Sequence, residues 1–197
     1  TKIYMQKFDK YKGLFAEQGG FDAPENYSVG IAFKATPALT VLADYRRINY
    51  NDVASVGNPS ASVVNCNLVG GADPSACLGG SNGAGFGWQN VNAYKVGFEY
   101  QYNSEILLRA GYSHNDNPIR SQDVTFNILA PGVIEDHVTL GFTYKTKSGG
   151  ELTMFYMHAF ENSVTGPSLF NRFGVPAGNE TIKMHQDSIG IAYGWKF

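Results

Sequence analysis

The chain has 197 residues, of which 23 are glycine, and its aromatic residues comprise 13 phenylalanines, 12 tyrosines and 2 tryptophans. Fifteen Lys and Arg residues against 17 Asp and Glu give a net charge of −2, so nothing in the electrostatics points to a nucleic-acid partner. Charged residues make up only 16% of the chain, which argues against disorder, coiled coils and helical bundles. No long uncharged apolar stretch predicts a transmembrane helix, and no signal peptide is visible at residue 1.

The first segment, residues 1–25, carries large apolar residues at roughly helical spacing over 4–16, with charged residues between them. We expect a loop segment with a short helix here. An exposed apolar helix suggests a contact surface, although packing within a cluster of loops explains the pattern equally well.

Residues 26–197 show a different pattern, in which large apolar residues alternate with small or polar ones. This period of two is typical of a strand with one apolar face. It occurs in seven segments, at 29–34, 41–46, 95–102, 107–112, 137–144, 152–160 and 188–197. The last segment carries Tyr193, Trp195 and Phe197 on its large face, as expected of an aromatic girdle at a membrane interface.

The predicted connections alternate between short and long. Short turns fall at about 36–38, 103–105 and 146–150, and long loops at about 47–90, 114–136 and 161–184. Short turns on one side and long loops on the other are typical of outer-membrane barrels, whose long loops are extracellular. The predicted fold is therefore an all-β, antiparallel transmembrane β-barrel, with about seven strands in this chain.

An odd number of strands indicates part of a larger barrel. Bacterial single-chain outer-membrane barrels have an even number of strands, and an open sheet would leave unpaired backbone groups in lipid. We therefore expect the C-terminal half of a larger barrel, which begins within an element at Thr1 and ends at a true C-terminus, Phe197.

Hairpin geometry predicts two cross-strand contacts on the face opposite the large residues. We expect Glu99 to face Arg109 as an opposite-charge pair, and Phe155 to face Gly141, where an aromatic ring would cover a strand glycine. Both registers keep the large side chains of the paired strands on one face.

Cys66 and Cys77 lie in one stretch rich in glycine, serine and asparagine, without a neighbouring histidine. They are either two free thiols or a disulfide that closes a short exposed loop in an oxidising compartment. We expect the disulfide, which would stabilise the loop by about 3 kcal/mol in the chain-entropy model.

Other motifs predict no covalent chemistry. The glycine-rich run 83–87 does not have the strand and helix context of a nucleotide loop. The four histidines show no zinc spacing, and nothing places a nucleophile beside a base. We expect no catalytic residue, no metal and no cofactor.

Three segments resemble the FadL/TodX family of outer-membrane transporters for long-chain fatty acids and other hydrophobic compounds. They are FDKYKGLFAEQG at 8–19, FNILAPGVIEDH at 126–137 and GIAYGWKF at 190–197. The resemblance implies a bacterial outer-membrane location and a fourteen-stranded barrel plugged by an N-terminal hatch. It implies as partners a hydrophobic or fatty-acid ligand, outer-membrane lipid, and the remaining N-terminal half with its hatch.

Moving a fatty acid requires a dry path for its tail and a cation for its carboxylate. The apolar residues that should point inward are Leu42, Leu107, Phe155 and Met157. They either line the path or pack against the hatch. The inward cations are Lys34, Arg46, Lys95 and Arg109. Glu99 competes with any ligand for Arg109.

The resemblance places Leu14 and Phe15 beside a docking groove for incoming ligand. We therefore expect a passive channel, not an enzyme, for compounds such as long-chain fatty acids or aromatic hydrocarbons. A general porin or an adhesion barrel is the main alternative, and a soluble lipid-binding β-barrel is a third.

Overall fold

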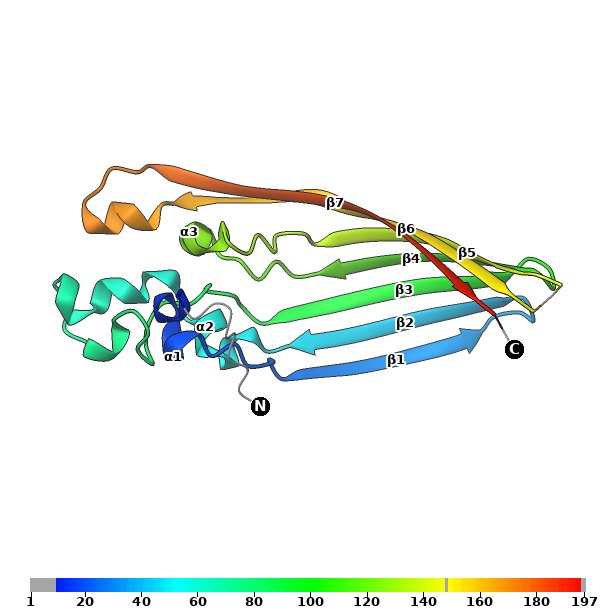
Figure 1. The fold of residues 1–197 in the computed structure, drawn as a ribbon, viewed down its shortest axis with the longest axis horizontal. Helices are drawn as coiled ribbons and strands as arrows, with labels where there is room; N and C mark the ends of the chain where they lie inside the picture. The colour runs from blue at the N-terminus through cyan, green and yellow to red at the C-terminus, as the bar shows by residue number, and fades with distance from the viewer. Residues whose placement is uncertain (1–9, 148, 196–197) are drawn as a thin grey trace.

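The computed structural model describes residues 10–147 and 149–195, apart from the side chain of Lys12. One seven-stranded sheet runs through it in the order β1 to β7, and each strand is antiparallel to the next (Figure 1). The strands are β1 (Asn26–Lys34), β2 (Leu39–Ile48), β3 (Val91–Gln101), β4 (Ile106–Asn115), β5 (Asp136–Lys145), β6 (Glu151–Pro167) and β7 (Asn179–Gly194). We call these seven strands the strand wall.

The helices all lie at one end of the strand wall, and the short turns lie at the other (Figure 1). The α-helices are α1 (Ala16–Gly19), α2 (Ala54–Gly57) and α3 (Val124–Asn127). The 3₁₀ helices are η2 (Lys12–Leu14), η3 (Tyr50–Asp52), η4 (Ser60–Asn65), η5 (Asn67–Val69), η6 (Pro74–Ala76), η7 (Ser121–Asp123) and η8 (Leu169–Phe173). Residues 10–25, 49–90, 116–135 and 168–178 together form what we call the loop cap. None of the described helices is long and apolar enough to cross a membrane.

The registers confirm the predicted cross-strand contacts. Glu99 pairs with Arg109 between β3 and β4, and Gly141 pairs with Phe155 between β5 and β6. The ring of Phe155 leans toward the other neighbour, Gly190 of β7, where a Cβ atom would lie 1.9 Å from Cε1 of the ring. The aromatic ring therefore covers a glycine of β7 more fully than the one on β5.

Two features differ from the expectation. Strands β6 and β7 have 17 and 16 residues and pair out to Pro167 and Asn179, so the expected loop at 161–184 shrinks to 168–178. A β-bulge between Ala159 and Asn162 interrupts the alternation of large and small residues on β6. For this reason the sequence pattern did not predict that the strand continues beyond the bulge. Residues 4–9 of the expected helix at 4–16 lie outside the described residues, and the rest forms the 3₁₀ turn η2 and the first residue of α1.

The large apolar side chains share one face of the strand wall, and no layer of the described residues covers them. Ile189, Ile191 and Leu140 are 78%, 69% and 61% exposed. A soluble barrel would pack these residues into a core, and the structure does not. This outward face is the one that meets lipid in a membrane barrel, and the opposite, inward face carries the glycines and charges.

Candidate functional site

A groove of about 740 Å³ crosses the inward face of the strand wall below the loop cap. Its floor is one cross-strand row, formed by Leu42, Gly97, Gly111, Thr139 and Met157. The two glycines of the row pair with each other, so the middle of the floor carries no side chains. The result is a low, mostly apolar trough that runs across the strands. We call it the inner groove.

The row above this floor is polar. It consists of Asp44, Lys95, Ser113 and His137, which are consecutive cross-strand partners or neighbours on β2 to β5. Lys95 forms no ion pair with any residue that the structure describes. Nδ1 of His137 is buried and has no hydrogen-bond partner within the described chain. Within the described residues, Lys95 is therefore an unpaired charge of this row, and Nδ1 of His137 is a buried polar atom without a partner.

Loop residues close the inner groove at its upper end. Tyr50 and Trp88 pack edge to face with their ring centroids 5.0 Å apart, and both line the groove. Burial raises the pKa of the Tyr50 hydroxyl, and the guanidinium of Arg46 opposes this shift. Tyr50 therefore stays a neutral, amphipathic ring at the mouth.

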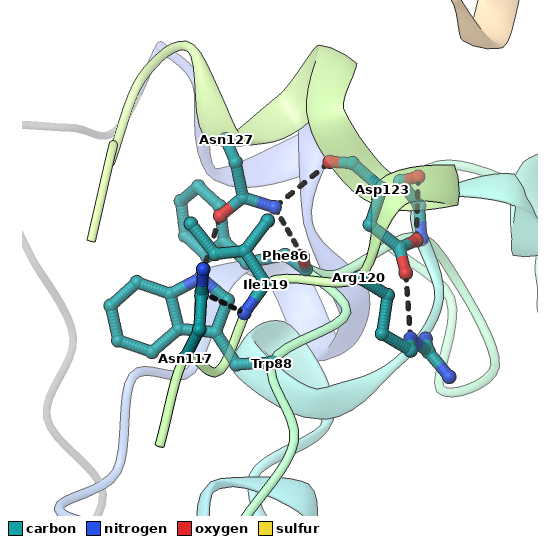
Figure 2. Close-up of polar contacts among 8 residues, drawn as sticks. Phe86, Trp88, Asn117, Ile119, Arg120, Asp123 and Asn127 are labelled. Carbon is teal, nitrogen blue, oxygen red and sulfur yellow. Dashed lines mark hydrogen bonds and ion pairs between the residues drawn. The ribbon is translucent and has the colours of Figure 1, made fainter. Parts of the chain in front are cut away.

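Trp88 is held in place by a polar network in the loop cap (Figure 2). Its indole Nε1 donates to Oδ1 of Asn127 over 2.6 Å, and Nδ2 of Asn127 donates to the backbone oxygens of Phe86 and Asp123. Asn127 is fully buried, so all of these bonds are shielded from water. The network ties two loops that are distant in sequence to the mouth of the inner groove.

The carboxylate of Asp123 is the centre of the same network (Figure 2). Oδ1 accepts from the backbone N and the Oγ of Ser60, and Oδ2 accepts from Nε of Arg120 over 2.8 Å. A Cβ atom on Gly87 would lie 2.2 Å from the carboxyl carbon, so only glycine fits beside this group. The carboxylate is fully buried and is compensated by an ion pair and hydrogen bonds.

A second polar row bounds the inner groove on the side of the short turns. Nε of Arg109 lies 2.9 Å from Oε2 of Glu99, and its Nη1 donates to Oγ1 of Thr143 over 2.8 Å. Thr143 in turn bonds to Thr153 of β6, in the next inward row toward the short turns. The partner expected for Arg109 is therefore confirmed, and its guanidinium is engaged by the wall itself.

The inner groove gathers some of the predicted ligand residues and leaves others apart. It is lined by Leu42, Arg46, Lys95 and Met157. Leu107, Arg109 and Phe155 lie nearer the short turns, and Lys34 ends β1. Phe15 is buried in the loop cap, where its ring centroid lies within 6 Å of the ring centroids of Phe21, Phe86 and Phe126. The neighbouring Leu14 is 38% exposed.

The predicted disulfide between Cys66 and Cys77 is confirmed, with the two Cα atoms 4.5 Å apart. It closes the part of the loop that carries Asp73. The hydroxyl and backbone N–H of Ser75 lower the pKa of the Asp73 carboxyl. Among the described residues, no group of three or more His, Cys, Asp or Glu could hold a metal ion.

Several residues of the inner groove were not among the ligand residues predicted from the sequence. Asp44 and His137 alternate in phase with residues that were singled out, so strand parity was a usable signal for them. Tyr50 and Trp88 had no such signal, because they come from loops whose return over the sheet depends on long-range packing.

Comparison with known proteins gives one family and several solved structures. The sequence model of the family described as Outer membrane protein transport protein (OMPP1/FadL/TodX) matches residues 20–172. No curated protein matches the chain.

Among the solved structures, the P. putida toluene transporter TodX is similar at a TM-score of 0.56 and 15% identity, over 90% of this chain and 35% of that one. A Pseudomonas aeruginosa FadL homologue is similar at a TM-score of 0.52 and 13% identity, over 86% of this chain and 34% of that one. The CymD monoaromatic hydrocarbon channel is similar at a TM-score of 0.50 and 15% identity, over 90% of this chain and 36% of that one. At these identities the likeness shows the fold alone, that of a partial β-barrel. The chain spans about a third of the length of these structures.

Proposed function

Because this chain belongs to the OMPP1/FadL/TodX family of outer membrane transport proteins, and is thus an outer-membrane protein, we propose that it forms part of a passive channel for hydrophobic compounds. The strand wall forms one side of the passage, and the loop cap forms part of its extracellular mouth. The channel works without ATP and without a covalent step.

The observation that carries this proposal is the inner groove. Its floor of Leu42, Gly97, Gly111 and Met157 is apolar and low, which is unusual for a water-filled pore. An apolar molecule that leaves water gains about 25 cal/mol for each Å² that it buries, so such a trough attracts it without an energy source. Diffusion down a gradient then suffices for uptake.

The polar row above the floor favours ligands with one charged or polar end. In our proposal Lys95 and Arg46 receive a carboxylate while Leu42 and Met157 contact the tail. Arg109, Lys34, Leu107 and Phe155 belong to the continuation of the path toward the short turns. Similar structures are described as a toluene transporter and a monoaromatic hydrocarbon channel, so aromatic hydrocarbons are the second ligand class.

The loop cap supplies the first contact in this proposal. Leu14 is 38% exposed at the extracellular end, and the neighbouring Phe15 is buried against the rings of Phe21 and Phe86, which hold this segment in place. The sheet has its open edges at β1 and β7. We propose that further strands of the same barrel, together with its hatch, meet these edges.

Uptake of oleate and of toluene by cells that make the complete protein tests the proposal. Gly97→Leu should lower the uptake of both compounds several-fold, because the new side chain fills the floor of the inner groove. Ala43→Leu creates the same side chain in the neighbouring outward row and should leave uptake unchanged. Lys95→Gln should reduce oleate uptake and spare toluene.

Equal uptake with and without the protein would overturn the proposal. Conductance to hydrophilic solutes without saturable uptake of either compound would identify a general porin instead.

A further inference from the structure

The outward face carries the same three-residue arrangement twice. On β4, Tyr112 and His114 are two residues apart, and both reach Oδ1 of Asp136 on β5. The tyrosine hydroxyl donates to this oxygen, and Nδ1 of the histidine lies 2.8 Å from it. On β6 and β7 the residues are Tyr156, His158 and Asp187.

The second arrangement matches the first atom by atom. The hydroxyl of Tyr156 donates to Oδ1 of Asp187 over 2.6 Å, and Nδ1 of His158 lies 2.8 Å from the same oxygen. Phe160 packs edge to face on His158, with the ring centroids 4.8 Å apart. We call the two arrangements the Tyr-His-Asp triads.

Both triads lie where the outward apolar face ends on the side of the loop cap. Tyr112, Val138, His158 and Asp187 form one cross-strand row over β4 to β7. The next row toward the short turns is apolar apart from one hydroxyl, and consists of Ala110, Leu140, Tyr156 and Ile189. We therefore place the histidines and aspartates of the triads at the depth of the lipid headgroups of the outer leaflet. The apolar row, which includes the ring of Tyr156, lies at the depth of the acyl chains.

Each triad presents an imidazole for an external partner. Because the carboxylate takes Nδ1, the ring is fixed with Nε2 directed away from it. The side chains of His114 and His158 are 42% and 33% exposed. An imidazolium backed by a carboxylate donates a charge-assisted hydrogen bond from Nε2 to an anionic oxygen. Strands β4 and β6 are two strand spacings apart, and His114 lies two residues beyond the row of Tyr112 and His158, so the two imidazoles are about 12 Å apart.

An apolar hollow of about 700 Å³ lies directly below the triads on the outward face. Its lining includes Phe98, Ala110, Leu140 and Tyr156. Ala110 creates the depth, because its partners Phe98 and Leu140 on the neighbouring strands are both large. Tyr156 joins the two parts, since its ring lines the hollow and its hydroxyl belongs to a triad.

We propose that this surface is a seat for one glycolipid of the outer leaflet whose headgroup carries two phosphates. Each triad receives one phosphate through the Nε2 of its histidine, and an acyl chain fills the hollow over Ala110. The occupant must be amphipathic, because an almost purely apolar hollow adjoins two polar triads. It must carry two acceptors, because the donors come in two equivalent copies. The proposal rests on the outer-membrane location of the chain and is independent of transport.

The histidines are the groups of this surface that can donate to a phosphate, because the nearby charged side chains are engaged with one another. Lys183, on β7 beyond the triads, is 2.8 Å from Glu161 and is paired with it. Asp136 and Asp187 are each already engaged by a tyrosine and a histidine, and the carboxylates of Glu135 and Asp116 also act electrostatically on His114. The phosphates would therefore be bound by directed hydrogen bonds and not by a basic patch.

Native mass spectrometry of the complete protein with added lipid tests the seat. The probes are lipid A, monophosphoryl lipid A and phosphatidylglycerol at equal concentration. We expect one retained lipid A, preferred about tenfold over phosphatidylglycerol, with monophosphoryl lipid A between them, since each charge-assisted contact adds to the affinity. The double variant His114→Gln with His158→Gln should lose this preference. Ala110→Phe should release lipid A by filling the hollow.

Two matched variants control for bulk and for histidine content. Ala43→Phe adds a ring to the outward face of β2, away from the hollow, and His137→Gln removes a histidine from the inward face of β5. Both should retain lipid A as the parent protein does. Heat-dependent gel mobility confirms that each variant forms a barrel. Equal retention of lipid A and phosphatidylglycerol by the parent protein, or unchanged retention in folded Ala110→Phe and in the double histidine variant, would overturn the proposal.

Discussion

In the strand wall, Ile191 and Leu140 are 69% and 61% exposed, whereas in the loop cap Val124, Asp123 and Asn127 are fully buried. The wall is one layer thick, and its backbone hydrogen bonds run between neighbouring strands. The cap has a small core of its own, in which Ile119, Val124, Val133 and Ile182 pack together. Ile182 comes from β7, so the core also anchors the cap to the upper wall.

This difference shows that two solvents act on one chain. The wall leaves its apolar surface for lipid to cover, so its burial is completed by the membrane. The cap stands in water and has to bury its own apolar and polar groups, as a soluble domain does. Changes in the cap should therefore act on local stability, and changes on the outward face should act on insertion.

The largest effect should follow from Asp123→Ala in the loop cap. The substitution leaves Arg120 without its carboxylate and removes the acceptor of Ser60, which should cost the cap about 3–5 kcal/mol. Hydrogen exchange resolved by segment should show faster exchange in 49–90 and 116–135. Glu161→Gln, which breaks an exposed ion pair, serves as the control. Equal acceleration in the strand wall would contradict a cap that unfolds independently.

Arginine substitutions at two adjacent positions of β5 should differ in their effect on stability, because the two side chains point to opposite faces of the wall. Leu140→Arg places a charge in the lipid and should destabilise the inserted barrel by about 2–4 kcal/mol. Thr139→Arg points the same side chain into the inner groove and should cost much less. Urea titration of the folded barrel in phospholipid vesicles measures both. If the two variants were equally destabilised, the assignment of the faces would be wrong.

Removal of the disulfide should affect one loop only. The double variant Cys66→Ser with Cys77→Ser opens a loop with a sequence separation of 11, which is worth about 3 kcal/mol or less in the chain-entropy model. Limited proteolysis should then cut faster between 66 and 77, and reduction of the parent protein should have the same effect. The exchange rates of the strand wall should not change.

The smallest effect should come from the ion pair on the inward face. Glu99 and Arg109 are both about two-fifths exposed, so Glu99→Gln should cost about 0.5 kcal/mol, and added salt should reduce the difference. Arg109 keeps its bond to Thr143 in this variant. A loss of several kcal/mol in the same vesicle titration would show that the pair is shielded by further parts of the barrel.

The strand pattern, the registers and the disulfide could be predicted because each depends on residues close in sequence. A hairpin with a short turn brings Glu99 to Arg109 once the parity of each strand is known. The extension of β6 could not be predicted in this way, because the bulge after Ala159 shifts the parity. Only the pairing with β7 restores the strand.

The inner groove was predictable in part. Leu42, Arg46, Lys95 and Met157 follow from strand parity, and the structure brings them together in one groove. The tyrosine and histidine of each triad are visible in the sequence as the motif Tyr-x-His, at 112–114 and again at 156–158. Their aspartates come from the following strands, so the repeated motif has meaning only with the register in hand.

The antiparallel wall, its two faces and the side on which the long loops lie all follow from the pattern of residues along the chain. These are local properties, because a side chain's face follows from its parity and a short turn sets the register of a hairpin. The way the loop cap folds over the wall does not follow from that pattern. Long-range packing buries Asp123 and Asn127 in the cap and places Tyr50 and Trp88 at the mouth of the inner groove. These contacts join residues far apart in the chain, where no periodicity links them and only the packing of the whole cap brings them together.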